Sequence, residues 1–252
     1  MSKIFDQEVE AGSDREELSK RRLKRVRGNT NLSFHYDKEY KGLSAQVSHG
    51  PLIVEWLEKI RLSLSEQVAM HSKVFALRID LHFPTFYMPP EGQVFGNDYY
   101  DRFKRHLKRL LEDVPDARNH GLRLIAAREY GERDGRLHFH VLLLLNGNSI
   151  RSTGLWELSE DNLYSRLHEA WAFALGMKAY EIQGLIEFSN GSEYRGNGRS
   201  QAKGGGFLLK RGDHEMFADI FFASTYLAKY ATKCFTDGCH PFLSSQLMIP
   251  DW

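Results

Sequence analysis

Two histidines stand one residue apart where the segment "GRLHFHVLLLLN" becomes strongly apolar. Alternate side chains of a β-strand lie on one face, so the imidazoles of His138 and His140 are predicted on the same face, about 6.6 Å apart along the strand. If Tyr130 pairs with Leu137 across the preceding turn, Glu129 lies directly opposite His138. Two imidazoles and one carboxylate form a ligand set for a divalent metal, with coordination positions left open for a substrate.

The same pairing places Ala127 opposite His140, where a small side chain leaves space for a ligand. A shift of the pairing by two residues would remove Glu129 from the set. The alternative interpretation is a strand end at which both imidazoles are satisfied by water and backbone. The motif by itself does not decide between a metal site and two ordinary strand histidines.

A second group of reactive side chains lies in "STYLAKYATK", which contains Tyr226, Lys229, Tyr230 and Lys233. Apolar periodicity predicts one helix over residues 213–233, with these four side chains opposite the apolar stripe and the tyrosines one turn apart. A phenol has a pKa of about 10, and a neighbouring ammonium group lowers this pKa and can hold a phosphate oxygen. The group indicates nucleophilic attack on a phosphate oriented by the metal, giving a phosphotyrosine. The alternative is core packing of the tyrosines.

The strands and helices that carry these groups are predicted from the periodicity of apolar residues. Strands are predicted at residues 73–83, 122–130, 135–146, 184–188 and 207–210. Helices are predicted at residues 51–70, 97–113, 160–175 and 213–233. Simple alternation of strands and helices would give fewer strands, and one close pair of strands is typical of a hairpin. We therefore expect an α+β fold with a central, mainly antiparallel β-sheet flanked by helices.

The N-terminal part differs in composition from the rest of the chain. Residues 1–19 are mostly acidic and polar, whereas "KRRLKRVR" carries six basic side chains: Lys20, Arg21, Arg22, Lys24, Arg25 and Arg27. This composition is typical of a solvated, partly disordered arm, and the alternative is a nucleic-acid contact. We expect a basic arm at residues 1–48 and one domain at residues 49–252 that ends in an irregular tail.

Two further patterns have weaker implications. Cys234, Cys239 and His240 would need a fourth ligand such as His214 to hold a structural zinc, and their spacing is atypical, so ordinary thiols are expected. The glycine-rich residues 195–206 lack the strand-then-helix setting of a phosphate-binding loop. A flexible loop is expected there, with a loop that grips a DNA strand as the alternative.

Composition sets limits on the partners and the compartment. The chain has 34 Lys and Arg against 33 Asp and Glu, so overall charge does not indicate a polyanionic partner. Two cysteines favour a reducing compartment. The sequence has neither an apolar run of membrane-spanning length nor the apolar core of a signal peptide. We expect a soluble, cytoplasmic protein.

The two motifs in this order resemble those of the HUH endonucleases, which include the initiators of rolling-circle replication. "HFH" follows a strand that ends in a glutamate, and "YLAKYATK" follows downstream on a predicted helix. The helix is similar to the two-tyrosine helix of the gene A proteins of isometric single-stranded DNA phages. "LRIDLHF", "GRLHFHVLLLLN" and "YLAKYATK" are more closely similar to the inovirus gene-2-type initiators, which include proteins of the YagK/YfjJ type. The resemblance covers roughly residues 50–235.

The resemblance implies roles for particular residues. His138 and His140 match the metal ligands, and Glu129 matches the acidic third ligand, a position at which these families differ. The nucleophiles and their helpers match four residues: Tyr226, Tyr230, Lys229 and Lys233. The strand "FALRIDLHF" stands at the family's first motif but lacks its usual threonines, which leaves Asp80 and His82 as candidate site residues without an assigned role.

The function implied by the resemblance is a site-specific endonuclease and strand transferase that requires Mg²⁺ or Mn²⁺. It would nick single-stranded origin DNA through a 5′-phosphotyrosine and start rolling-circle replication of a phage, prophage or satellite element. The implied partners are origin DNA, a host helicase and replication proteins in the bacterial cytoplasm, with no membrane. The alternatives are a two-tyrosine transposase, a non-catalytic DNA-binding regulator on the same fold, and a metal-dependent hydrolase that activates water.

Overall fold

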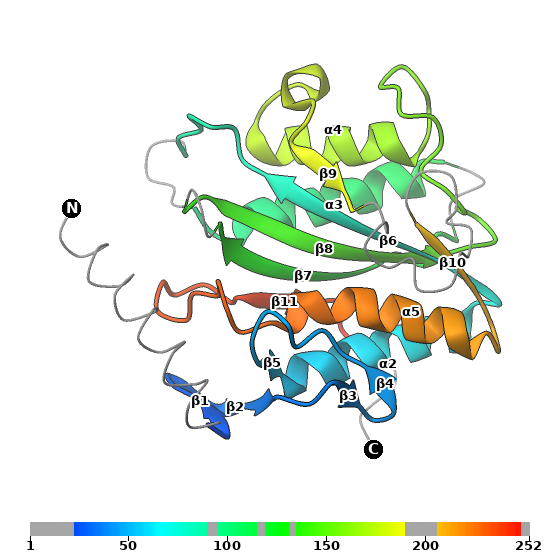
Figure 1. Cartoon of the computed structure of the whole chain (residues 1–252). Helices are drawn as coiled ribbons and strands as arrows, with labels where there is room; N and C mark the ends of the chain where they lie inside the picture. Colours follow the sequence, from blue (N-terminus) through cyan, green and yellow to red (C-terminus); the bar gives the residue numbers. More distant parts are fainter. Residues whose placement is uncertain (1–22, 90–94, 115–118, 132–134, 190–205, 248–252) are drawn as a thin grey trace.

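The computed structural model describes residues 23–89, 95–114, 119–131, 135–189 and 206–247. Its centre is a six-stranded sheet with the strand order β10–β6–β8–β7–β11, in which β9 also pairs with β6 (Figure 1). The strands are β6 (Lys73–His82), β7 (Arg123–Tyr130), β8 (Leu137–Asn146), β9 (Ile186–Phe188), β10 (Phe207–Lys210) and β11 (Phe242–Ser244). Every pair in this sheet is antiparallel, so the predicted sheet is confirmed.

Helices cover both faces of the sheet (Figure 1). On one face lie α3 (Asp98–Glu112) and α4 (Leu163–Leu175). On the other face lie α2 (Val54–Met70) and α5 (His214–Ser224). The predicted α+β class is therefore confirmed. Within the described residues, no helix combines the length and the apolar character that a membrane span requires.

Each face of the sheet has its own apolar core. Phe139 of the central strand β8 packs against Tyr100 of α3 in the first core, with ring centroids 5.8 Å apart. Leu142 of the same strand belongs to the second core, with α2 and α5. Burial of each such side chain stabilises the fold by about 1.5–3 kcal/mol. Because alternate side chains point to opposite faces, His138 and His140 lie on the same face as Leu142, towards α2 and α5.

The N-terminal segment forms short strands that pack on the second core. They are β1 (Arg25–Val26), β2 (Asn29–His35), β3 (Glu39–Tyr40), β4 (Leu43–Ser44) and β5 (Leu52–Ile53). Phe34 and Tyr40 are buried in this core, and β2 pairs with both β1 and β5. The arm predicted at residues 1–48 is therefore folded from residue 23 onward, and pairing crosses the predicted boundary. Residues 1–22, with Lys20, Arg21 and Arg22, lie outside the described residues, as do residues 195–205 of the glycine-rich segment.

The C-terminal part departs from the prediction in two places. The tail, predicted to be irregular, contributes the edge strand β11. The predicted helix over residues 213–233 is wrong beyond residue 228, because α5 is followed only by the short 3₁₀-helix η4 (Thr225–Ala228). Lys229 is extended, with φ −62° and ψ 140°. The next amide, of Tyr230, donates to the carbonyl of Pro51 at 3.0 Å, so tertiary bonding replaces the next helical turn.

Candidate metal centre and tyrosine site

The hairpin of β7 and β8 has the predicted register. Tyr130 is paired with Leu137, Glu129 with His138, and Ala127 with His140. The prediction succeeded because a six-residue turn and a period of two leave few pairings that keep both strands buried.

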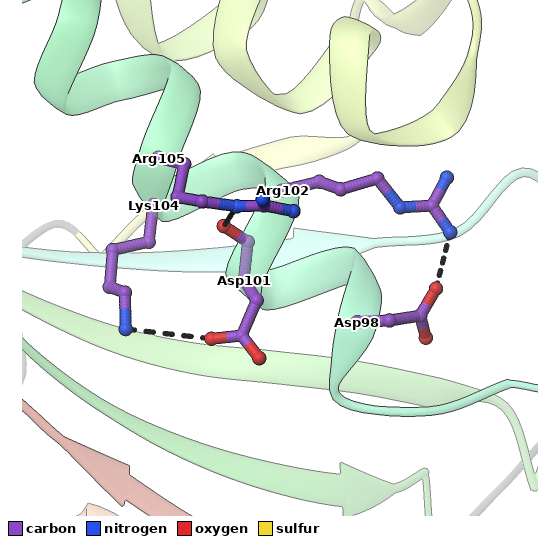
Figure 2. A pocket seen from close by; sticks show the side chains of 5 residues that line it. All are labelled: Asp98, Asp101, Arg102, Lys104 and Arg105. Atoms are coloured by element: carbon purple, nitrogen blue, oxygen red, sulfur yellow. Dashed lines mark hydrogen bonds and ion pairs between the residues drawn. The ribbon is translucent and has the colours of Figure 1, made fainter.

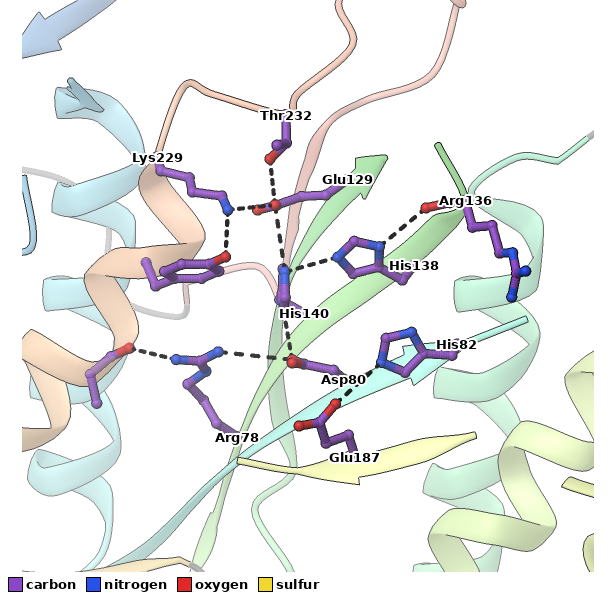
Figure 3. A network of polar contacts seen from close by, with 12 residues as sticks. Arg78, Asp80, His82, Glu129, Arg136, His138, His140, Glu187, Lys229 and Thr232 are labelled. Carbon is purple, nitrogen blue, oxygen red and sulfur yellow. Dashed lines mark hydrogen bonds and ion pairs between the residues drawn. The ribbon is translucent and has the colours of Figure 1, made fainter. Parts of the chain in front are cut away.

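Three ligand atoms converge on this face. Nε2 of His138 lies 3.1 Å from Nε2 of His140, and His140 Nε2 lies 3.5 Å from Oε2 of Glu129 (Figure 3). Each of the three residues offers one ligand atom, and these three atoms lie within 4.8 Å of one another. Neighbouring ligands about 2.1 Å from an octahedral cation are about 3.0 Å apart, close to the spacing of the two imidazole nitrogens. The donor set therefore fits a divalent cation.

Asp80 supports this set from the neighbouring strand. The pairing of β6 with β8 puts Asp80 opposite His140, and Asp80 Oδ1 lies 2.6 Å from His140 Nδ1. An ionised carboxylate only accepts hydrogen bonds, so Nδ1 carries the proton and Nε2 is left as the ligand atom. Asp80, whose role the sequence left unassigned, thus holds the ring of His140 through this hydrogen bond.

His82 lies beside the three ligand residues but outside their set. It is paired with His138, and the two rings are stacked with centroids 5.4 Å apart. Its Nε2 lies 3.7 Å from Oε2 of Glu187 on β9. His82 therefore forms the edge of the cluster nearest to β9 (Figure 3).

The two ligand histidines have opposite pKa shifts. Burial, together with the nearby His140, lowers the pKa of His138 to about 4. Burial opposes protonation of His140 as well, but Asp80 and Glu129 outweigh it and raise its pKa. At neutral pH His138 is thus a neutral imidazole, which is the form that binds a metal.

Glu129 is a buried carboxylate surrounded by cations. Oε2 lies 3.0 Å from Lys229 Nζ and accepts a hydrogen bond from Thr232 Oγ1 at 2.5 Å, while Oε1 pairs with Lys233. Burial opposes ionisation of Glu129, but Lys233, His140 and Lys229 outweigh it and hold its pKa well below the usual range. Glu129 is therefore ionised and available as the third ligand.

Lys233 is placed differently from the prediction. Its side chain is fully buried against Glu129. Burial lowers the pKa of Lys233 to about 8, although Glu129 opposes the shift. The contacts make Lys233 the buried counter-charge of Glu129 rather than a partner of Tyr230.

Tyr226 reaches the group of Glu129, His138 and His140 through two contacts. Its ring is perpendicular to that of His140, with centroids 5.0 Å apart. Lys229 Nζ donates to its hydroxyl at 2.5 Å and also contacts Glu129, so one ammonium group bridges the phenol and the third ligand. The structure therefore brings the predicted Tyr226 and Lys229 together with the predicted ligands.

The ring of Tyr230 has different neighbours from that of Tyr226. Its ring packs against Phe34, with centroids 5.0 Å apart, and against Phe235, with centroids 5.5 Å apart. The expected pair of equivalent tyrosines depended on a helix that continues to residue 233. Because the helical structure ends at Ala228, the second tyrosine packs with the N-terminal strands.

Three residues near the site were not predicted from the sequence. The guanidinium group of Arg78 lies 5.1 Å from the centroid of the Tyr226 ring, and the ring of His49 lies 5.6 Å from it. Arg78 alternates with Asp80 on β6, so the period of two would have placed it on the site face. His49 and Thr232 come from irregular segments, and no sequence pattern indicates them.

Two other candidates do not form part of this site. In the described part of the chain, the residues Glu129, His138 and His140 are the one group that could hold a metal, so the cysteine motif does not assemble. A pocket of about 410 Å³ is lined by Asp98, Asp101, Arg102, Lys104 and Arg105. These side chains pair with one another along α3, on the other face of the sheet (Figure 2).

Comparison with known proteins identifies a family. YagK of Escherichia coli (strain K12) is 28% identical over 226 residues, which are 84% of this chain and 100% of YagK. YfjJ of the same organism is 25% identical over 222 residues, which are 82% of this chain and 97% of YfjJ. No solved structure matches significantly. The family described as the YagK/YfjJ C-terminal domain matches residues 36–245, a range that includes all the site residues above. The chain belongs to the YagK/YfjJ C-terminal domain family.

Proposed function

We propose that this protein is a metal-dependent endonuclease of the HUH type, which nicks single-stranded origin DNA and starts rolling-circle replication of a phage, prophage or satellite element. One observation carries the proposal. A phenol, the ammonium group that bonds it and a two-histidine, one-carboxylate set share one face of the sheet. An ordinary pair of strand histidines does not need this combination.

The residues divide the reaction between them. His138, His140 and Glu129 would hold Mg²⁺ or Mn²⁺, which when bound polarises the scissile phosphate. The Tyr226 oxygen attacks phosphorus, forming a phosphotyrosine as the bond to the 3′ oxygen breaks; the phenol loses its proton and the released 3′ oxygen gains one. Lys229 stabilises the phenolate as it forms, because it already bonds the hydroxyl.

We propose one nucleophile in each chain. The predicted exchange between two tyrosines requires both phenols at one metal, and the packing of Tyr230 against Phe34 and Phe235 does not support it. A two-tyrosine transposase is less well supported for the same reason. The contact between Lys229 and Tyr226 does not favour a hydrolase that activates water or a DNA-binding regulator, because neither requires an activated phenol. The proposed partners remain origin DNA, a host helicase and replication proteins in the bacterial cytoplasm.

Covalent transfer of DNA to the protein tests this function. Single-stranded oligonucleotides that tile the genetic element carrying this gene are labelled at the 3′ end, because the proposed linkage retains the 3′ fragment. We expect an adduct that survives SDS, requires Mn²⁺ or Mg²⁺ and is absent from Tyr226→Phe. Cleavage without an adduct that persists in Tyr226→Phe would instead indicate an activated-water hydrolase.

A further inference from the structure

A buried arginine lies beside the candidate metal site of Glu129, His138 and His140. Arg78 stands on β6 two residues before Asp80, so both side chains are on the same face of the sheet. The side chain of Arg78 is only 9% exposed. Burial of a guanidinium group is unfavourable unless the group is paired and hydrogen-bonded, so its contacts indicate what it does.

Arg78 makes contacts in three directions (Figure 3). Its Nη1 donates to the carbonyl of Ala223, in the last turn of α5, at 3.2 Å. Its Nη2 lies 3.8 Å from Oδ1 of Asp80, the oxygen that also binds His140. Its guanidinium carbon lies 5.1 Å from the centroid of the Tyr226 ring. The contacts form a continuous chain from the phenol ring to a metal ligand.

Each contact fixes a different part of the site. The bond to Ala223 holds the backbone three residues before Tyr226. The contact with the Tyr226 ring is a cation–π interaction, which fixes the ring itself. The ion pair with Asp80 holds the carboxylate that orients His140. An arginine can make these contacts together because its planar guanidinium group carries five donors, which an ammonium group cannot reproduce.

We infer that Arg78 is a positioning residue that holds the Tyr226 phenol and the His140 imidazole in a fixed relation. The inference rests on the proposed function and adds to it a residue that contacts the Tyr226 ring, Asp80 and the backbone of α5. Misplacing reacting groups by about 1 Å can lower a rate by about 10²-fold. Loss of Arg78 therefore lowers the rate of adduct formation more than it lowers the binding of DNA or metal.

Arg78→Lys is the first test, with Arg123→Lys as its matched control. Arg123 is also a buried arginine and lies on the same face of the sheet as Arg78. It stands at the start of β7, at the end of that strand away from Glu129, where it pairs with Glu66. At saturating oligonucleotide we expect Arg78→Lys to form the adduct on the order of 10²-fold more slowly. We expect oligonucleotide and Mn²⁺ affinities within about threefold of wild type, and Arg123→Lys should keep the wild-type rate. Equal rates for the two folded variants would overturn the inference.

Arg78→Ala separates positioning from general stability. Added guanidinium ion at millimolar concentration should restore part of its adduct rate, because the ion replaces the missing group without changing the chain. Thermal unfolding of the variant is followed in parallel. A rate that follows only the fraction of folded protein, with no recovery in guanidinium, would show a merely structural role.

A spectroscopic readout distinguishes failure of this inference from failure of the proposed function. Tyrosines are replaced by 3-fluorotyrosine, and the ¹⁹F resonance of Tyr226 is assigned by its absence from Tyr226→Phe. We expect Arg78→Lys to shift this resonance and Arg123→Lys to leave it in place, whether or not the wild type forms an adduct. An unchanged resonance in Arg78→Lys would refute the positioning role even if wild-type protein nicks DNA.

Discussion

At the residue scale, the site is a set of mutually dependent charges. Glu129 is ionised inside the fold because Lys229 and Lys233 surround it, and His140 presents Nε2 because Asp80 holds Nδ1. The same carboxylate that would bind the metal thus also holds the ammonium group that bonds Tyr226. A change at one of these residues is therefore expected to affect the others.

Metal binding tests the ligand set directly. His138→Ala and His140→Ala should each abolish tight Mn²⁺ binding in calorimetric titration, because each removes one of three ligands. Asp80→Asn should weaken binding by about 10–100-fold, since it removes the partner that orients His140. Asp98→Asn, on the exposed surface of α3, is the control and should bind as wild type. Wild-type affinity in a double His138→Ala, His140→Ala variant would refute the assignment.

Replacement of Lys233 tests whether this buried cation stabilises the fold. Lys233→Met should lower the free energy of unfolding by about 3 kcal/mol, because it breaks a buried ion pair and leaves Glu129 undercompensated. Denaturant unfolding measures the loss. A variant of wild-type stability that forms adduct more slowly would return Lys233 to the helper role predicted from the sequence.

At the element scale, five of the six strands of the sheet and the register of the β7–β8 hairpin could be predicted, but the edge strand β11 and the end of the last helix could not. The pairing of Glu129 with His138 follows from a short turn and a period of two. The apolar spacing around Tyr230 satisfies a helix equally well, and the helix ends where Lys229 bridges to Leu52 and Tyr230 bonds to Pro51, contacts that are distant in the sequence. Strands of two residues, such as Glu39–Tyr40, carry too little periodicity to be seen. Strand alternation could have placed Arg78 on the site face, because it stands two residues before Asp80 on β6. His49 lies in an irregular segment, where no such rule applies.

The stabilising contribution of Glu58, whose carboxylate links α2 to Tyr40 of β3, has a predictable pH dependence. We call this set of contacts the Glu58 clamp. Arg61 is the main cause of the lowered pKa of Glu58, about 2, with further bonds from Lys41 and Tyr40. A carboxyl group whose pKa is lower in the folded state stabilises the fold above its unfolded pKa of 4.5, and this contribution is lost as the pH falls from there towards 2. Glu58→Gln should therefore be less stable than wild type at pH 7, with the difference shrinking below about pH 4.5.

Denaturant midpoints of the two proteins between pH 7 and pH 3 give the comparison. Glu112→Gln, which removes an exposed pair with Lys108, is the control and should show a small, nearly constant difference. A Glu58→Gln difference that does not vary with pH would rule out this clamp.

At the scale of the whole molecule, the N-terminal region is bonded to the segment around Tyr226. The amide of Gln46 donates to Thr225 Oγ1 at 3.1 Å, and its side chain donates to the carbonyl of Phe222 at 2.7 Å. Because the chain carries 34 basic and 33 acidic residues, no overall field attracts DNA. The proposed DNA binding would therefore depend on local groups, and we propose the basic run of residues 20–27 as one of them.

The salt dependence of DNA affinity tests the contribution of this basic run. Replacing Lys20, Arg21 and Arg22 by alanine should weaken single-stranded DNA binding without changing sequence preference, because phosphate contacts carry little base information. Each lost contact should flatten the slope of log affinity against log salt by about 0.7. Fluorescence anisotropy over a salt series gives the slope. An unchanged affinity and slope would mean that Lys20, Arg21 and Arg22 make no contact with DNA.

Digestion of the adduct with trypsin tests whether Tyr226 alone attacks the DNA. Cleavage after Arg211, Lys229 and Lys233 places Tyr226 in the peptide of residues 212–229 and Tyr230 in the peptide "YATK". The adduct is purified, treated with nuclease to leave a short nucleotide remnant, digested with trypsin and analysed by mass spectrometry. We expect the remnant on the peptide of residues 212–229 and none on "YATK". A remnant on "YATK" would contradict the account, because the structure packs Tyr230 against Phe34 and Phe235 and places Tyr226 beside His140.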